Sequence, residues 1–385
     1  MDLHKLWNAE KKADPALAWW AQNSKCAYQE AFRDLDRALR DFTASRKGVR
    51  KGRRLGFPRF KKRGKCKDSF RFSTGAMRCA GNTVTLPRLG AIGTHESTRK
   101  LARRLANGAA RILSATVSRT AQRWFVSFTV EVDRAAGGRH ARPGSVIGVD
   151  PGVKTLLTGV DDGGNVVTVA GPRALRSALR ALRRASRAHS RTARGSANRR
   201  RRAARLARIH ARVADVRADA LHKATTDLAR RYETVVAEDL NVAGLTRNRR
   251  LARAIADQGF GQARRMLGYK TAWAGGTLIL ADRWYPSTKT CSGCGTVKAK
   301  LALSERTYHC DHCGLDLDRD VNAARNLMHL AASGAESQNA CGGCARPGTT
   351  GQRPAKQEPG TAHTGKTGTA GPQDPAASHP LTTVN

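Results

Sequence analysis

The stretch Ser-Val-Ile-Gly-Val-Asp at residues 145–150 decides the fold, because its β-branched residues make a short strand that ends on the carboxylate of Asp150. Two further strand-like runs follow at 155–160 and 165–169, and the turn Asp-Asp-Gly-Gly at 161–164 joins them. The spacing of these runs predicts a three-strand meander.

Downstream of this meander the chain alternates between strand and helix patterns. A strand is expected at 233–240, and it again brings carboxylates, Glu238 and Asp239, to its end. A helix is expected at 257–274 and a strand at 277–280. This alternation predicts an α/β core.

The charge of the chain indicates its partners. Among 385 residues, 70 Lys+Arg stand against 30 Asp+Glu, which gives a formal net charge of +40. Self-repulsion of this size opposes compaction unless a polyanion neutralises it, and nucleic acid is the first candidate. No apolar run approaches the roughly 18 residues of a membrane span, and no signal-peptide core opens the chain. We therefore expect a soluble, intracellular protein with no membrane partner.

A basic segment at 46–67 contains no acidic residue and carries Phe-Pro-Arg-Phe at 57–60. Arginine interleaved with aromatic rings is typical of backbone contact combined with base or sugar stacking. A solvated basic loop is the alternative. The candidate nucleic-acid contacts here are Arg53, Arg54, Arg59, Lys61 and Lys62.

A second basic region at 173–212 also lacks acidic residues and shows leucines at helical spacing, with a break near 195–196. Charged residues on a helix usually form a solvated face. Like charges four residues apart destabilise an isolated helix, however, and no acidic residue compensates them here. A nucleic-acid backbone would relieve that repulsion, so Arg180, Arg183 and Arg184 are further candidate contacts.

The residues ahead of the α/β core divide into two parts. Residues 1–44 have apolar positions at helical spacing that is broken near Pro15, which predicts a helical segment. Residues 69–133 alternate as strands do, with a short helix expected at 97–105, and predict a small antiparallel barrel or sheet. Arg-Pro-Gly at 142–144 resembles a domain boundary.

The cysteines indicate a metal site. The spacing Cys291-x2-Cys294, fifteen residues, Cys310-x2-Cys313 supplies four thiolates, which suit a closed tetrahedral zinc site with no catalytic position. A glycine follows each pair and suits a tight turn toward the metal. His309 and His312 are expected at the surface. The isolated pair Cys341-Gly-Gly-Cys344 is expected to bind no metal, in a disordered tail.

Carboxylates form a second, distributed signal. Asp150 and Glu238 end strands, and Asp316-Leu-Asp318-Arg-Asp320 precedes a helix expected at 321–330. Carboxylates gathered in a polyanion-binding protein would repel the substrate unless they held Mg²⁺ or Mn²⁺, and two such ions hydrolyse phosphodiesters. The alternatives are that Asp150 is a turn residue, that Asp239 replaces Glu238, and that Asp318 or Asp320 caps the helix.

Four motifs resemble the TnpB family in order. They are Val-Ile-Gly-Val-Asp-Pro-Gly at 146–152, Val-Ala-Glu-Asp-Leu-Asn-Val at 236–242, Tyr-Pro-Ser-Thr-Lys-Thr-Cys-Ser-Gly-Cys-Gly at 285–295 and Cys-Asp-His-Cys-Gly-Leu-Asp-Leu-Asp-Arg-Asp-Val-Asn-Ala-Ala-Arg-Asn at 310–326. Gly-Phe-Pro-Arg-Phe-Lys-Lys at 56–62 matches as well, and the resemblance spans about residues 20–330. Members of this family are transposon-encoded RNA-guided DNA nucleases, long described as OrfB-type transposases and related to type V CRISPR effectors.

The resemblance implies an RNase H-like (RuvC) nuclease core with an inserted zinc ribbon, and catalytic acids at Asp150, Glu238 and Asp320. It also implies a guide RNA, a target DNA duplex, and a prokaryotic, cytoplasmic, nucleoid-associated protein. The expected parts are a helical recognition segment 1–45, a basic linker 46–68, a β-rich wedge domain 69–143, RuvC-like part I at 144–172, a basic helical insertion 173–232, RuvC-like part II at 233–285, the zinc ribbon 286–317, RuvC-like part III at 318–330 and a disordered tail 331–385.

One departure from the family concerns the start of the chain. Members open with a strand and a further helix ahead of the matched segment, so we expect a shortened N-terminus. The alternatives to a nuclease are a non-cleaving RNA-guided DNA-binding protein, an inactive transposon relic, and a zinc-ribbon RNA binder. A strand-joining DDE transposase is disfavoured, because the central acid is Glu238 in a Glu-Asp-Leu-Asn context.

Overall fold

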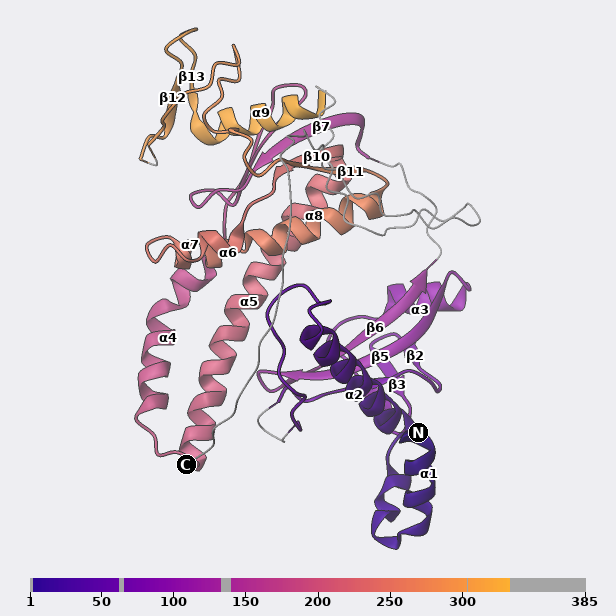
Figure 1. The fold of residues 1–385 in the computed structure, drawn as a ribbon. Coiled ribbons are helices and arrows are strands. Elements are labelled where there is room, and N and C mark those ends of the chain that lie inside the picture. The colour runs from indigo at the N-terminus through magenta and orange to yellow at the C-terminus, as the bar shows by residue number, and fades with distance from the viewer. Residues whose placement is uncertain (1–2, 62–65, 133–139, 303, 333–385) are drawn as a thin grey trace, which may run out of the picture. The chain divides into compact units, whose positions relative to one another are not determined.

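A computed structural model describes residues 3–61, 66–132, 140–302 and 304–332 (Figure 1). Lys62, the pair Cys341 and Cys344, and the predicted tail from residue 333 onward lie outside these residues. The described residues comprise an N-terminal part, up to residue 132, and a second part from residue 140 onward.

The N-terminal helical segment is broken where the sequence predicts. Helix α1 spans Leu3–Ala13, the 3-10 helix η1 spans Pro15–Gln22, and α2 spans Lys25–Arg46. Asp14 accepts a hydrogen bond from the Ala16 amide at 2.8 Å, so it caps η1 ahead of the proline.

The β-rich part consists of two three-stranded antiparallel sheets that share one core. The first has the order β1-β5-β6, and the second has the order β2-β3-β4. Phe72, Leu86 and Val117 are buried in the shared core, together with Cys26 of α2. The elements are β1 Ser69–Phe72, β2 Arg78–Ala80, β3 Thr83–Leu86, β4 Gly90–Gly93, α3 Arg99–Ala106, β5 Ala110–Thr120 and β6 Arg123–Val132.

The predicted α/β core is a five-stranded sheet with the order β11-β10-β7-β8-β9. Strands β7, β8 and β9 form the expected antiparallel meander, and β10 runs parallel to both β7 and β11. This order and these directions define an RNase H-like sheet. The strands are β7 Arg142–Asp150, β8 Leu157–Asp161, β9 Val166–Val169, β10 Tyr232–Glu238 and β11 Thr277–Ala281.

Helices cover both faces of this sheet (Figure 1). Ile147 and Val149 of β7 pack with Leu221 of α5 and Met266 of α8 on one face. Val236 of β10 packs with Leu327 of α9 on the other. The helices of this part are α4 Ala174–Ser190, α5 Ala197–Arg231, α6 Val242–Leu245, α7 Ala252–Gln258, α8 Phe260–Ala274 and α9 Arg319–Ala332. Because side chains alternate along a strand, the even-numbered residues of β7 from Val146 and of β10 from Thr234 face α9, whereas Tyr232, before a register shift in β10, packs on the other face.

Gly148 lets α9 lie directly on the backbone of β7. A Cβ atom at this position would meet the Ala324 carbonyl oxygen at 2.1 Å and the Met328 nitrogen at 2.3 Å, and both of these atoms belong to α9. No side chain fits there, so the closest approach of helix to sheet depends on glycine. This contact fixes the height of α9 above the strand that ends at Asp150.

The basic helices α4 and α5 pack against each other as a hairpin, as Figure 1 shows. Gly195, with a φ of +82°, makes the turn, and Ser196 caps α5 by accepting a hydrogen bond from the Arg199 amide at 3.1 Å. The start of α4 is capped by Asp257, whose oxygens accept hydrogen bonds from the amides of Leu175 and Arg176. The break predicted near 195–196 is confirmed.

Two boundaries differ from the sequence-based expectation. The helix expected at 257–274 is divided into α7 and α8, because Gly259 adopts a left-handed φ of +72° between them. Strand β7 begins at Arg142, so it includes the stretch 142–144 that was expected to be a domain boundary. The Arg142 side chain contacts the buried Asp161 carboxylate at 2.5 Å.

A search of the described helices for a long, apolar segment able to cross a membrane finds none.

We predict that Gly148→Ala destabilises the protein by about 3 kcal/mol or more, because the new Cβ must push α9 away from β7. Chemical denaturation of both proteins measures the change. Gly268→Ala in α8 is the matched control, since its Cβ meets its nearest atom at 3.8 Å and the helix gains up to about 1 kcal/mol. Equal stability of Gly148→Ala and wild type would contradict the close contact.

Candidate functional site

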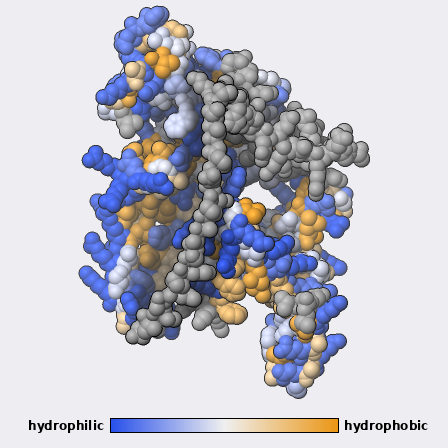
Figure 2. All heavy atoms as spheres, in the orientation of Figure 1, coloured by the Kyte–Doolittle hydropathy of each residue, from blue (hydrophilic) through white to orange (hydrophobic). Residues whose placement is uncertain are grey.

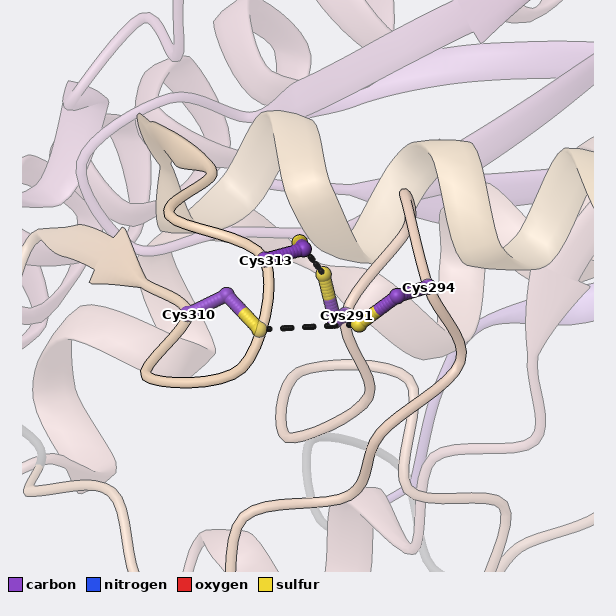
Figure 3. Close-up of side chains that lie close together, drawn as sticks. All are labelled: Cys291, Cys294, Cys310 and Cys313. Carbon is purple, nitrogen blue, oxygen red and sulfur yellow. Dashed lines mark hydrogen bonds between the residues drawn. The ribbon is translucent and has the colours of Figure 1, made fainter.

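Four cysteine side chains point toward one another in the segment between β11 and α9 (Figure 3). The sulfur atoms of Cys291 and Cys313 lie 3.6 Å apart, as do those of Cys294 and Cys310, and all four atoms lie within 4.8 Å of one another. A tetrahedral zinc ion with Zn–S bonds of about 2.3 Å separates its sulfur ligands by about 3.8 Å. The cluster could therefore hold a metal ion, with zinc as a good fit.

Two matching backbone turns present these thiols. The Gly295 amide donates to the Cys291 carbonyl and the Gly314 amide donates to the Cys310 carbonyl, both at 2.9 Å. Gly295 and Gly314 adopt φ values of +76° and +71°. Both glycines are those expected from the sequence, because only glycine takes this conformation without steric cost.

The four thiols compete with one another for negative charge. Hydrogen bonding between Cys294 and the Thr296 hydroxyl and amide lowers the pKa of Cys294 to about 5. The Leu315 amide favours the thiolate of Cys313, but the neighbouring thiols, Cys294 foremost, raise the pKa of Cys313 to about 12. A divalent cation would remove this conflict by stabilising all four thiolates.

The fold brings the three predicted acids to one edge of the central sheet. Asp150 ends β7 two residues after Gly148, and Glu238 ends β10 two residues after Val236. Period-two alternation therefore places both on the face that α9 covers. Asp320 lies in the first turn of α9, and one of its carboxylate oxygens lies 3.5 Å from the position that a Cβ would take on Gly152, just beyond Asp150.

The electrostatics of Asp150 indicate that the three side chains are close. Removal from water raises the pKa of its carboxyl well above the ordinary value, and the charges of Glu238 and Asp320 raise it further, against the opposing effect of Arg319. Burial also raises the pKa of Glu238, while a hydrogen bond from the Ser287 hydroxyl lowers it. Ionising these groups together is costly without a cation.

The contacts of Asp239 and Asp318 bear on two of the alternatives, that Asp239 replaces Glu238 and that Asp318 or Asp320 caps the helix. Asp239 is held by Arg264 and by Arg283, the latter at 2.6 Å, so its charge is already neutralised by arginines. Asp318 accepts hydrogen bonds from the amides of Asp320 and Val321, which makes Asp318 the helix cap. Glu238 and Asp320 therefore remain available to face Asp150.

The three carboxylates are less tightly gathered than the thiols. Among the described residues, the cysteine cluster is the group in which three or more ligand atoms all lie within 4.8 Å of one another. A wider triangle is compatible with two cations about 4 Å apart, since each acid then needs to reach only one or both of them.

Two buried asparagines of α9, which the sequence analysis did not single out, connect the cysteine cluster to the acids. Asn322 donates to the Thr290 carbonyl at 2.7 Å and accepts from the Ser292 amide at 3.0 Å, on either side of Cys291. Asn326 donates to the carbonyls of Ser287 and Thr290, both at 2.7 Å. The segment that these asparagines hold also carries the Ser287 hydroxyl to Glu238. Both asparagines lie in the motif at 310–326 that resembles the TnpB family. Their place in that motif was the signal in the sequence that could have identified them.

The predicted basic contacts are solvent-exposed. Arg180, Arg183 and Arg184 line one groove on α4 together with Arg187 and Arg191. Figure 2 shows hydrophilic side chains projecting outward along this edge of the molecule.

The basic segment 46–61 presents its candidates differently. Arg53, Arg54 and Arg59 are exposed on irregular backbone, and Phe60 is 96% exposed. Lys61 is also exposed but contacts Asp34 at 3.3 Å. The segment therefore offers cations and a free aromatic ring to solvent.

Two family models match this chain. Residues 127–249 match the OrfB-type model described as "probable transposase", and residues 260–327 match the model "Cas12f1-like, TNB domain". Together the matches span most of the central sheet, the helices on both of its faces and the cysteine cluster.

Relatives that align over most of the chain extend the match. A protein of Mycobacterium tuberculosis, named "putative RNA-guided DNA endonuclease", is 39% identical over 339 residues, which cover 84% of this chain and 73% of the relative. A Streptomyces pristinaespiralis protein of the same name is 39% identical over 361 residues, covering 92% of this chain and 84% of the relative. The chain therefore belongs to the TnpB family of RNA-guided DNA endonucleases, and it is a nuclease by family.

A solved structure shares the fold. The protein in a cryo-electron microscopy structure of a Cas12f1-sgRNA-target DNA complex superposes with a TM-score of 0.51 at 14% identity, covering 76% of this chain and 69% of that one. At this identity the similarity concerns the fold alone.

We predict that the purified protein contains about one zinc ion per chain, and that Cys310→Ser loses it. The ribbon should then lose order, and its hydrogen bonds to α9 should loosen, which lowers the thermal midpoint. Metal analysis and thermal denaturation measure both effects. Cys66→Ser, at an exposed thiol outside the cluster, is the control. A zinc-free variant with wild-type stability would show that the metal is dispensable.

We also predict that Asp150→Asn raises the thermal midpoint in magnesium-free buffer, because it removes a carboxyl whose charge is opposed by burial and by the charges of Glu238 and Asp320. Added Mg²⁺ should stabilise wild type and have no such effect on the variant. Asp316→Asn, at an exposed acid of β13 (Asp316–Asp318), is the control. An equal response of both proteins to Mg²⁺ would argue against ion binding at Asp150.

Proposed function

We propose that this protein is a transposon-associated RNA-guided DNA endonuclease that hydrolyses target DNA at Asp150, Glu238 and Asp320 with Mg²⁺ or Mn²⁺. The observation that carries the proposal is that Asp150 and Glu238 end neighbouring strands at one edge of the sheet, on the face covered by α9, whose first turn carries Asp320. Membership of the TnpB family supports the RNA-guided activity, since the relatives carry that name.

The chemistry needs no covalent nucleophile from the chain. Two divalent ions at such a site activate water and stabilise the leaving oxygen of a phosphodiester. The charges of both Glu238 and Asp320 act on Asp150, so Asp150 is suited to contact both ions. Ser287 orients Glu238 by its hydrogen bond, and the N-terminal turn of α9 holds Asp320.

Zinc has a structural role in this proposal. Cys291, Cys294, Cys310 and Cys313 would bind it in a closed site, so no position remains for a substrate. Through Asn322 and Asn326 the ribbon then holds α9 and the Ser287 segment in place. Zinc loss would disturb the acids without removing any of them.

The nucleic-acid partners follow from the relatives and the charge. The solved Cas12f1 complex is named for an sgRNA and a target DNA, and we propose a guide RNA and a target DNA duplex as the partners here. The arginine groove of α4 and the exposed segment 46–61 are the proposed backbone contacts. A DNA target implies action in the prokaryotic cytoplasm, at the nucleoid.

The test begins with the chain expressed from its native locus, flanking non-coding DNA included, and with sequencing of the RNA that copurifies. A discrete RNA identifies the guide, whereas random RNA removed by moderate salt would contradict guided activity. The guide then programmes cleavage of a matching plasmid library.

We predict that Asp150→Ala and Asp320→Asn reduce cleavage by at least about 10³-fold while RNA binding is unchanged, because both remove ion ligands. Gel assays of cleavage and filter binding of the RNA measure the two properties. Asp316→Asn should cleave as wild type does. Retained cleavage in Asp150→Ala would overturn the assignment of the catalytic site. A wild-type complex that binds its target without cutting it would instead support the alternative of a non-cleaving RNA-guided DNA-binding protein.

A further inference from the structure

Trp284 is the most exposed tryptophan among those of the described residues, with 85% of its surface accessible. Single exposed apolar side chains are common on protein surfaces, so the contacts and neighbours of Trp284, and not its exposure alone, decide whether it belongs to a site. The rings of Trp7, Trp19, Trp20, Trp124 and Trp273 each contact another aromatic ring or a cation in the structure. In the part of the chain that the structure describes, no such contact is found for Trp284.

The backbone on both sides of Trp284 is firmly held. The Trp284 amide donates to the Asp282 carboxylate at 2.8 Å, and the Arg283 guanidinium donates to Asp239 at 2.6 Å. The Tyr285 hydroxyl donates to the Asn326 carbonyl of α9 at 3.2 Å. The ring is therefore presented to solvent from a fixed position and is not part of a loose loop.

The same cleft contains Trp284 and a proposed catalytic acid. Glu238, Asn241, Arg283, Trp284 and Tyr285 all line it. The Trp284 ring offers a face for base stacking beside a carboxylate proposed to bind metal, while the Arg283 guanidinium holds Asp239 and the Asn241 side chain accepts a hydrogen bond from the Gly244 amide. A nucleotide seated there would have its phosphate close to the acids.

We propose that Trp284 is a stacking platform for a base of the DNA strand that is cut, and that it positions the neighbouring phosphate at the acids. The inference rests on the proposed nuclease function and identifies a positioning residue for it. The strand must be unpaired there, because a duplex hides the faces of its internal bases. DNA is favoured over the guide RNA, because the cleft shares Glu238 with the cleavage site.

The first test maps contacts without requiring cleavage. Full-length Asp150→Ala protein with its guide is bound to target DNA that carries 5-iododeoxyuridine at successive positions of each strand, irradiated, and analysed by peptide mass spectrometry. We expect a cross-link from a DNA base to Trp284. The inference would be overturned if Trp284 cross-linked to iodouridine in the guide RNA. It would also be overturned if no position of the DNA gave a cross-link to Trp284.

The second test measures single-turnover cleavage of bound target. Stacking of a base on tryptophan is sequence-tolerant, and its loss should slow cleavage by about tenfold or more in Trp284→Ala. Trp284→Phe should restore most of the rate and Trp284→Leu should not, since only an aromatic ring stacks. Target binding and the thermal midpoint should not change. Trp273→Ala, at an exposed ring that packs on Tyr269, is the control.

The two proposals fail in different ways. A wild-type complex that does not cut overturns the nuclease function, while the cross-link still decides whether DNA contacts Trp284. A wild-type complex that cuts and a Trp284→Ala complex that cuts equally fast overturn the stacking platform alone.

Discussion

The contact between α9 and Gly148 is the constraint on which the rest of the nuclease part depends. A helix normally rests on the side chains of a sheet, but here its backbone meets the backbone of β7, because glycine leaves no Cβ in the way. This approach sets Asp320 above the strand end that carries Asp150. The neighbouring strand β10 runs parallel to β7 and therefore ends at the same edge, where it adds Glu238.

The acids of the site repel one another, and hydrogen bonds from the surrounding structure hold them in place. Burial raises the pKa of Asp150, and the charges of Glu238 and Asp320 raise it further. The surroundings hold the acids in place through α9, whose asparagines bind the segment leading into the cysteine cluster. The strongly basic composition suits a polyanionic partner, and the gathered acids suit the cations that we propose at this site.

Local sequence patterns predicted most of the elements, and the structure confirms them. The meander, the break near Pro15, the hairpin turn at Gly195 and the cysteine knuckles all depend on neighbouring residues, so short-range chemistry decides them. The errors concern the bounds of two elements. Gly259 divides the helix expected at 257–274, and β7 begins earlier than expected, at Arg142, whose side chain contacts Asp161. The roles of Asn322 and Asn326 were missed, because their partners lie thirty or more residues away.

The sequence by itself determined the spacing of the thiols, the strands that end in carboxylates and the family resemblance, because each of these is written in consecutive residues. Only the tertiary structure decided which acids meet. Arg264 and Arg283 neutralise Asp239, whereas Glu238 is left facing Asp150, and neither arginine is near Asp239 in the sequence. Likewise, tertiary packing alone leaves Trp284 in solvent beside Glu238, since burial depends on contacts that form only when distant segments pack together.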